Sequence, residues 1–189
     1  MEATSGQGEM VQHSMPRALT VPEIRQIIRD FEQAARNAMA AGFDGVELHG
    51  ANGYLIEQFM DSQTNLRTDE YGGTLENRLR FLKEVTAAVV NAIGAGKVGV
   101  RQAPLTKLMG AVDDHPEETY IAAASLLNKI GVVYIHIAEA DWENAPVMST
   151  GFKDAYRHAF NGTLIYSGNY TRERAENALQ IGVITLKTK

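Results

Sequence analysis

The sequence predicts an α/β fold in which strands and helices alternate and the strands form a parallel sheet. Two observations support this fold class. The spacing of apolar residues switches repeatedly between the spacing typical of helices and the alternation typical of strands, and the connections between the predicted elements are short. At 189 residues the chain is long enough to bury one ordinary core. We therefore expect an irregular lead over residues 1–18 and one α/β domain over residues 19–189.

The first helix is expected to begin after Thr20. Thr20 and Glu23 have the spacing of a capping box, and Pro22 lies in the first turn, where proline is tolerated. Apolar residues then recur at helical spacing until Gly42, which ends the helix. The next residues, 43–49, are predicted to form a strand.

The same alternation continues along the chain. Further helices are predicted over residues 74–93, 114–130, 150–160 and 171–181. Further strands are predicted over residues 97–101, 132–137 and 163–167, with a fifth strand left open at 183–186. Gly131 is expected to supply the C-cap of its helix.

The alternation of side chains within the strands narrows the fold class. Apolar side chains are predicted to face the helices at Val46, Leu48, Val98, Val100, Val133, Ile135 and Ile137. The opposite face gathers Glu47, His49, Arg101 and His136. A doubly wound sheet would be apolar on both faces, whereas a (β/α)8 barrel becomes polar at the C-terminal rim, where such barrels carry out chemistry. We therefore predict a partial (β/α)8 TIM barrel.

The number of predicted strands is too small for a closed barrel. A complete barrel needs about 250 residues, and the sequence has four clear strands. Two open sheet edges would favour pairing with another chain. We therefore expect either self-association through these edges or a place within a longer protein.

Composition excludes several functional classes. The formal charge of -5 and the lack of a Lys and Arg cluster give no indication of nucleic-acid binding. No apolar run reaches the roughly 20 residues that span a bilayer, and the N-terminus lacks a secretory pattern. Without cysteine there is no disulfide, thiolate metal site or thiol nucleophile. We expect a cytoplasmic protein with no membrane partner and no metal.

Three polar residues follow the first predicted strand at close spacing: His49, Asn52 and Tyr54. An imidazole and a carboxamide can each donate a hydrogen bond to one carbonyl oxygen. A tyrosine stays protonated at neutral pH and can deliver a proton. Together they would suit polarisation and protonation of an α,β-unsaturated carbonyl compound. The alternative is structural: His49 hydrogen-bonds within a loop and Tyr54 packs in the core.

Arg101 ends the second predicted strand on the polar face. Its fixed charge could lie against an electron-rich ring or an anion. The alternative is a salt bridge to Glu47 on the neighbouring strand, because buried charges are usually paired. Both roles are compatible.

Gly168 and Asn169 follow the fourth predicted strand and precede a helix capped by Thr171. Phosphate commonly binds at this position in barrels, although Gly-Asn is also ordinary turn chemistry. His136 is interpreted as structural, and Trp142 as a residue that covers the core. The loop of residues 65–73 is also interpreted as structural, and we expect it to be held by an ion pair between Arg67 and Asp69.

These segments together resemble the Old Yellow Enzyme family of flavin oxidoreductases. The matching stretches are Ser14 to Leu19, Ala40 to Leu55 with its His-Gly-Ala-Asn-Gly-Tyr centre, Arg67 to Gly73, Val98 to Arg101, and Gly168-Asn169. Within the family the sequence looks most like bacterial N-ethylmaleimide reductases and, more distantly, plant 12-oxophytodienoate reductases.

The resemblance implies an FMN-dependent ene-reductase in which NADPH or NADH is the reductant. His49 and Asn52 match the pair that binds the oxygen of an enone, maleimide or nitro-compound substrate. Tyr54 matches the proton donor. Arg101 matches the arginine beside the flavin, and Gly168 and Asn169 match the loop near the FMN phosphate.

The sequence also departs from the family pattern. Family members have three further strands before residue 11 and an eighth strand with a Gly-Arg pair, so the present strands correspond to the fourth to seventh. Gln102-Ala103 stands where Leu-Ser is usual. The alternative to an enzyme is therefore a non-catalytic remnant that at most binds a partner. A Schiff-base aldolase would need a lysine at an inward strand end, and Lys97 lies at a strand start instead.

Overall fold

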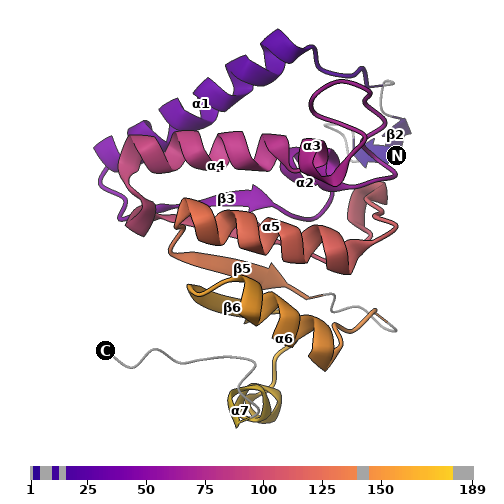
Figure 1. Cartoon of the computed structure of the whole chain (residues 1–189), viewed down its shortest axis with the longest axis vertical. Coiled ribbons are helices and arrows are strands. Elements are labelled where there is room, and N and C mark those ends of the chain that lie inside the picture. The colour runs from indigo at the N-terminus through magenta and orange to yellow at the C-terminus, as the bar shows by residue number, and fades with distance from the viewer. Residues whose placement is uncertain (1, 5–9, 13–15, 140–144, 181–189) are drawn as a thin grey trace.

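The computed structural model describes residues 2–4, 10–12, 16–139 and 145–180 (Figure 1). Its main sheet contains four parallel strands in the order β3 (Val46–Gly50), β4 (Val98–Gln102), β5 (Tyr134–Ala138) and β6 (Thr163–Ser167). Two short strands, β1 (Glu2–Thr4) and β2 (Met10–Gln12), pair antiparallel within the lead that was expected to be irregular.

Each strand of the main sheet is followed by helical structure, so the predicted β/α alternation is confirmed. The helices are α1 (Val21–Ala40), α2 (Leu55–Met60), α3 (Leu75–Arg78), α4 (Arg80–Ile93), α5 (Pro116–Ile130), α6 (Thr150–Ala159) and α7 (Arg172–Gln180). Two short 3-10 helices, η1 (Ala95–Lys97) and η2 (Leu108–Gly110), lie in connections. The helices α1, α4, α5 and α6 pack side by side in that order and cover one face of the sheet (Figure 1).

The helix ends follow the local sequence signals. The Thr20 side chain accepts a hydrogen bond from the Glu23 backbone N–H at 3.4 Å, and the Glu23 carboxylate accepts one from the Thr20 backbone N–H at 2.8 Å, which confirms the capping box. Gly131 adopts the left-handed conformation at the end of α5, as predicted. The predicted helix of residues 74–93 is instead divided into α3 and α4 at Leu79.

The strand boundaries differ more from the prediction. The first strand begins at Val46 instead of residue 43, and Phe43 is 67% exposed. The third begins at Tyr134, so Val133 lies before it and is 41% exposed, and its predicted place on the helix-facing side is wrong. The open fifth strand at 183–186 lies outside the described residues.

The core lies between the sheet and the helices. On the sheet side it contains Leu48, Val98, Val100, Ile135, Ile137 and Leu164, all buried. On the helix side it contains Phe81, Leu82, Val85, Val89, Ala123, Ala124, Leu127 and Phe152. The other face of the sheet has Glu47 and His49 exposed and Arg101 and His136 half-buried, so the predicted separation into an apolar and a polar face is confirmed.

Candidate functional site

Three polar residues of neighbouring strands lie in one row at the C-terminal end of the sheet. His49 on β3 is the register partner of Arg101 on β4, and Arg101 is the register partner of His136 on β5. Because side chains alternate between the faces of a strand, register partners project from the same face. The row therefore places an imidazole, a guanidinium and a second imidazole next to one another on the polar face.

The electrostatic environment of His49 favours its neutral form. Partial burial lowers the pKa of His49, and the positive charge of Arg101 lowers it further, while Glu47 opposes the shift. A neutral imidazole carries one N–H donor and one acceptor nitrogen. His49 can therefore donate a hydrogen bond to a carbonyl oxygen at neutral pH.

Asn52 and Tyr54 are carried by the loop between β3 and α2. Asn52 and Gly53 both have positive φ angles, of 59° and 76°. A Cβ atom on Gly53 would lie 2.5 Å from the carbonyl oxygen of Leu108, so glycine is required there for packing as well as for conformation. The left-handed turn brings the Tyr54 ring to 5.2 Å from the His49 ring, between centroids, in an edge-to-face arrangement.

The structure shows neither of the structural roles that were considered as alternatives for His49 and Tyr54. The Tyr54 side chain is not packed in the core, because it is 54% exposed. Within residues 16–139 and 145–180, the hydrogen bonds include none from the side chains of His49 or Asn52. Among the described residues, the polar groups of both side chains therefore have no hydrogen-bond partner.

Arg101 contacts His136 instead of Glu47. The Nη1 atom of Arg101 lies 3.1 Å from Nδ1 and 3.0 Å from Nε2 of His136. His136 Nδ1 is 3.0 Å from a Glu47 carboxylate oxygen. The Arg101–Glu47 salt bridge that was considered as an alternative is therefore not formed: the imidazole of His136 lies between the two charges.

His136 also links the sheet to its last strand. Its Nε2 atom is 2.9 Å from the Ser167 hydroxyl on β6. His136 thus contacts residues of β3, β4 and β6 from its place on β5. The structural role predicted for it agrees with these contacts.

Gly168 and Asn169 lie at the same edge of the sheet, directly after β6. Their φ angles are +124° and 51°, and a Cβ on Gly168 would lie 2.5 Å from the carbonyl oxygen of Glu139. Thr171 accepts a hydrogen bond from the Arg174 backbone N–H at 3.2 Å and so caps α7 as predicted. The Arg174 guanidinium donates to the carbonyl oxygen of Gly168 at 2.8 Å.

Sequence reasoning missed the charged cluster beneath this loop. Glu139 is buried and accepts from Arg174 at 2.7 Å, and Lys153 lies 2.6 Å from its other carboxylate oxygen. Glu139 follows the third predicted strand, so its place after a strand was a usable signal. The cluster holds the loop that contains Gly168 and Asn169 against β5.

The donor set at the rim fits a flavin. Among the described residues only Nη1 of the Arg101 guanidinium makes hydrogen-bond contacts, which leaves the donors on Nε and Nη2 for an electron-rich partner. Arg101 and the Gly168-Asn169 turn lie at the C-terminal ends of β4 and β6, so both would face one ligand along the same rim. Trp142 lies outside the described residues.

In the part of the chain that the structure describes, no helix is long and apolar enough to cross a membrane. Over the same residues, no group of three or more His, Asp or Glu side chains is placed to hold a metal ion.

Proteins with similar sequences include 12-oxophytodienoate reductases of two plants. The chain is 43% identical over 189 residues to a putative 12-oxophytodienoate reductase 10 of Oryza sativa subsp. japonica, an alignment that covers 96% of this chain and 60% of the rice protein. It is 45% identical to 12-oxophytodienoate reductase 2 of Arabidopsis thaliana over 88% of this chain and 45% of that protein. The predicted relationship to 12-oxophytodienoate reductases is confirmed.

Solved structures give the same relationship in three dimensions. Morphinone reductase superimposes with a TM-score of 0.90 and 40% identity over 97% of this chain and 50% of its own. The Old Yellow Enzyme homologue of Zymomonas mobilis superimposes with a TM-score of 0.86 and 38% identity over 93% and 50%. The partial (β/α)8 barrel is therefore confirmed, and the chain spans about half the length of the relatives it matches.

A family model covers nearly the whole sequence. It matches residues 2–186, and its description is the NADH:flavin oxidoreductase / NADH oxidase family. The expected cofactors, FMN with NADH or NADPH, agree with that description and with a solved complex of morphinone reductase with tetrahydroNAD. Together with the row of His49 and Arg101 at the strand ends, this match shows that the chain belongs to the NADH:flavin oxidoreductase / NADH oxidase family.

Proposed function

We propose that this chain contributes the substrate-activating part of an FMN-dependent NAD(P)H ene-reductase. The proposed substrates are alkenes activated by a carbonyl or nitro group, including the enones and maleimides expected from the sequence. The observation that carries the proposal is the meeting of three groups at one strand end: His49 is the register partner of Arg101, and the Tyr54 ring lies 5.2 Å from the His49 ring.

Each side chain has a role that follows from its surroundings. His49, held neutral, and the uncommitted Asn52 carboxamide would both donate to the substrate oxygen, which withdraws electron density from the β-carbon. Tyr54 is exposed beside them and would deliver a proton to the α-carbon. The two hydrogen bonds to the substrate oxygen and the nearby proton donor together would make the alkene a better hydride acceptor.

Two sets of residues would hold the flavin. Arg101 would place positive charge beside the ring system, and the backbone N–H groups around Gly168 and Asn169 would face the phosphate. When bound, FMN supplies a hydride that it has received from NAD(P)H. The chain's own contribution is to bind, orient and polarise the substrate and to supply the proton.

The test is reconstitution of the purified chain with FMN. We expect a yellow protein that oxidises NADPH when 2-cyclohexenone is added, and we expect the turnover to be lost in His49→Ala. The matched control is His158→Ala, because His158 is an exposed histidine on α6. A protein that stays colourless after reconstitution would overturn the proposal for this chain.

One observation favours a second candidate function. Within the described residues, β3 and β6 each pair with only one neighbour, so both edges of the sheet expose backbone hydrogen-bonding groups. A non-catalytic remnant would use these edges to bind a partner or another copy of the chain. It predicts oligomers without flavin in sedimentation velocity, whereas a flavin-loaded species that turns over the enone contradicts it.

A further inference from the structure

The loop that contains Asn52 and Tyr54 is held from below by the first turn of α2. The backbone N–H of Gly53 donates a hydrogen bond to a Glu57 carboxylate oxygen. The carbonyl oxygen of Gly53 accepts one from the Gln58 side chain at 2.6 Å. Both backbone groups of the residue between Asn52 and Tyr54 are therefore fixed by side chains of one helix.

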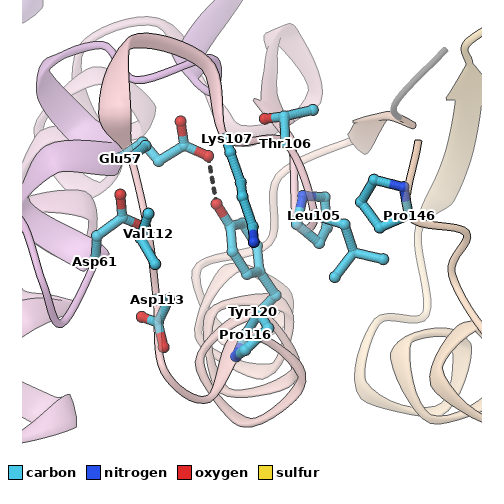
Figure 2. A pocket seen from close by; sticks show the side chains of 12 residues that line it. Glu57, Asp61, Leu105, Thr106, Lys107, Val112, Asp113, Pro116, Tyr120 and Pro146 are labelled. Carbon is cyan, nitrogen blue, oxygen red and sulfur yellow. Dashed lines mark hydrogen bonds between the residues drawn. The ribbon is translucent and has the colours of Figure 1, made fainter. Parts of the chain in front are cut away.

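Glu57 occupies the third position of α2, from which an acidic side chain reaches back to the residues before the helix. Its second carboxylate oxygen accepts a hydrogen bond from the Tyr120 hydroxyl on α5 at 2.5 Å (Figure 2). Glu57 and Tyr120 are 1% and 2% exposed. One buried carboxylate thus joins the loop to a helix that packs against the sheet.

The surroundings make a carboxylate costly at this position. Glu57 lines a cavity of about 90 Å³ together with Asp61, Asp113 and Lys107 (Figure 2). Burial raises the pKa of Glu57, while the hydrogen bonds from Gly53 and Tyr120 oppose the shift. Glu57 also raises the pKa of Asp61. An apolar side chain would avoid this repulsion but would leave the Gly53 N–H without its acceptor.

The left-handed turn needs such a fixed acceptor. Asn52 is a non-glycine residue at a φ of 59°, a conformation that costs free energy unless its surroundings impose it. The hydrogen bond from Gly53 fixes the peptide that follows Asn52 and precedes Tyr54. The directions of both side chains depend on this peptide.

We propose that Glu57 is a positioning residue, which holds the Asn52 carboxamide and the Tyr54 hydroxyl in place through the Gly53 N–H and is itself anchored by Tyr120. Its meaning for catalysis rests on the proposed function, in which Asn52 and Tyr54 act on the substrate. The contact between Glu57 and Gly53 is independent of that function. It can therefore be tested without flavin.

The first measurement uses the wild-type chain. In an isotope-labelled sample, the Gly53 amide proton should shift on pH titration with the same midpoint as the Glu57 carboxyl carbon. The other titratable groups around Glu57 are Asp61 directly after α2, Tyr120 on α5, Arg78 on α3, and Asp113 and Lys107 in the connection after β4. A Gly53 signal that stays constant through the Glu57 midpoint would overturn the proposal.

The second measurement compares variants by amide hydrogen exchange. Glu57→Leu should speed exchange of the Gly53 amide at least tenfold beyond any change in global stability. Glu57→Gln should restore protection, because its amide oxygen can accept from Gly53 while its amide nitrogen donates to Tyr120. Unchanged exchange in a folded Glu57→Leu chain would contradict the proposal.

The structure supplies a matched control for these variants. Tyr71 donates to Glu84 at 2.7 Å, which is a second tyrosine–glutamate pair on a different part of the fold. Glu84→Leu should leave the exchange of Gly53 unchanged relative to global stability. If Glu57→Leu does not fold, the titration of the wild-type chain still tests the contact between Glu57 and the Gly53 N–H. Neither readout involves FMN, so failure of the proposed function would appear separately, as a chain that remains colourless.

Discussion

The ring of Tyr134 on β5 lies directly over Gly99, its register partner on β4. A Cβ atom on Gly99 would come closer than 3.0 Å to the ring, a separation that Cβ atoms in proteins essentially never show. Burial raises the pKa of Tyr134 to about 12, and the nearby negative charge of Glu47 adds to the shift. The missing side chain of Gly99 thus makes room for part of the polar face.

Gly99→Ala is therefore expected to destabilise the fold. Overpacking of this kind costs about 1–3 kcal/mol, because the ring or the strands must shift. Urea unfolding should show this loss, and Gly96→Ala should show much less, since a Cβ there meets nothing within 4 Å. In the double variant Gly99→Ala/Tyr134→Ala the two effects should be far from additive. Additive effects would mean that the ring does not determine the cost.

Arg101→Ala is expected to weaken FMN binding about tenfold or more. A charge-assisted hydrogen bond contributes about 1.5–3 kcal/mol, and the Arg101 donors on Nε and Nη2 are uncommitted among the described residues. Quenching of flavin fluorescence on titration measures the affinity. Arg36→Ala is the control, because Arg36 forms an exposed pair with Glu32 on α1. Equal affinities for Arg101→Ala and wild type would remove Arg101 from the flavin site.

Local sequence signals were sufficient for two of the helix ends and for the faces of β4 and β5. The capping box at Thr20 and the glycine at 131 depend on neighbouring residues alone, and both are confirmed. The period of two in β4 and β5 placed Arg101 and His136 on the same face, which the register confirms. These features are predictable because they require no knowledge of distant contacts.

Features that depend on tertiary packing were not predicted. The helix α2 is six residues long and its N-cap residue makes no side-chain hydrogen bond, so no local signal marks its start. Glu57 was missed for the same reason. The insertion of His136 between Arg101 and Glu47 depends on how three strands align, and register follows from the packed core.

Tyr54→Phe is expected to separate substrate binding from proton delivery. The variant keeps the ring beside His49 but loses the hydroxyl, so the kcat for enone reduction should fall about 100-fold or more. KM should change little, because His49 and Asn52 remain. His49→Ala should lower kcat and also raise KM, since it removes a donor that both binds and polarises the substrate oxygen. Steady-state kinetics at several enone concentrations distinguish the two outcomes, and an unchanged kcat in Tyr54→Phe would rule out this proton donor.

The acidic cluster beside α2 should make stability depend on pH. Burial and the charges of Glu57 and Asp113 raise the pKa of Asp61 to about 7, so the folded chain binds a proton that the unfolded chain releases near pH 4. Stability should therefore fall as the pH rises from about 4 to about 7, because the folded state binds more protons over that range.

Asp61→Asn removes this titration and should flatten the pH dependence. From about pH 5 to about pH 8, the free energy of unfolding of the wild type should fall by about 1–2 kcal/mol more than that of the variant. This difference is already reduced for solvent screening. Urea unfolding at both pH values measures the two losses. Asp30→Asn is the control, because Asp30 is exposed on α1. Parallel pH curves for wild type and Asp61→Asn would show that Asp61 is already ionised throughout, and that the cluster does not hold a proton.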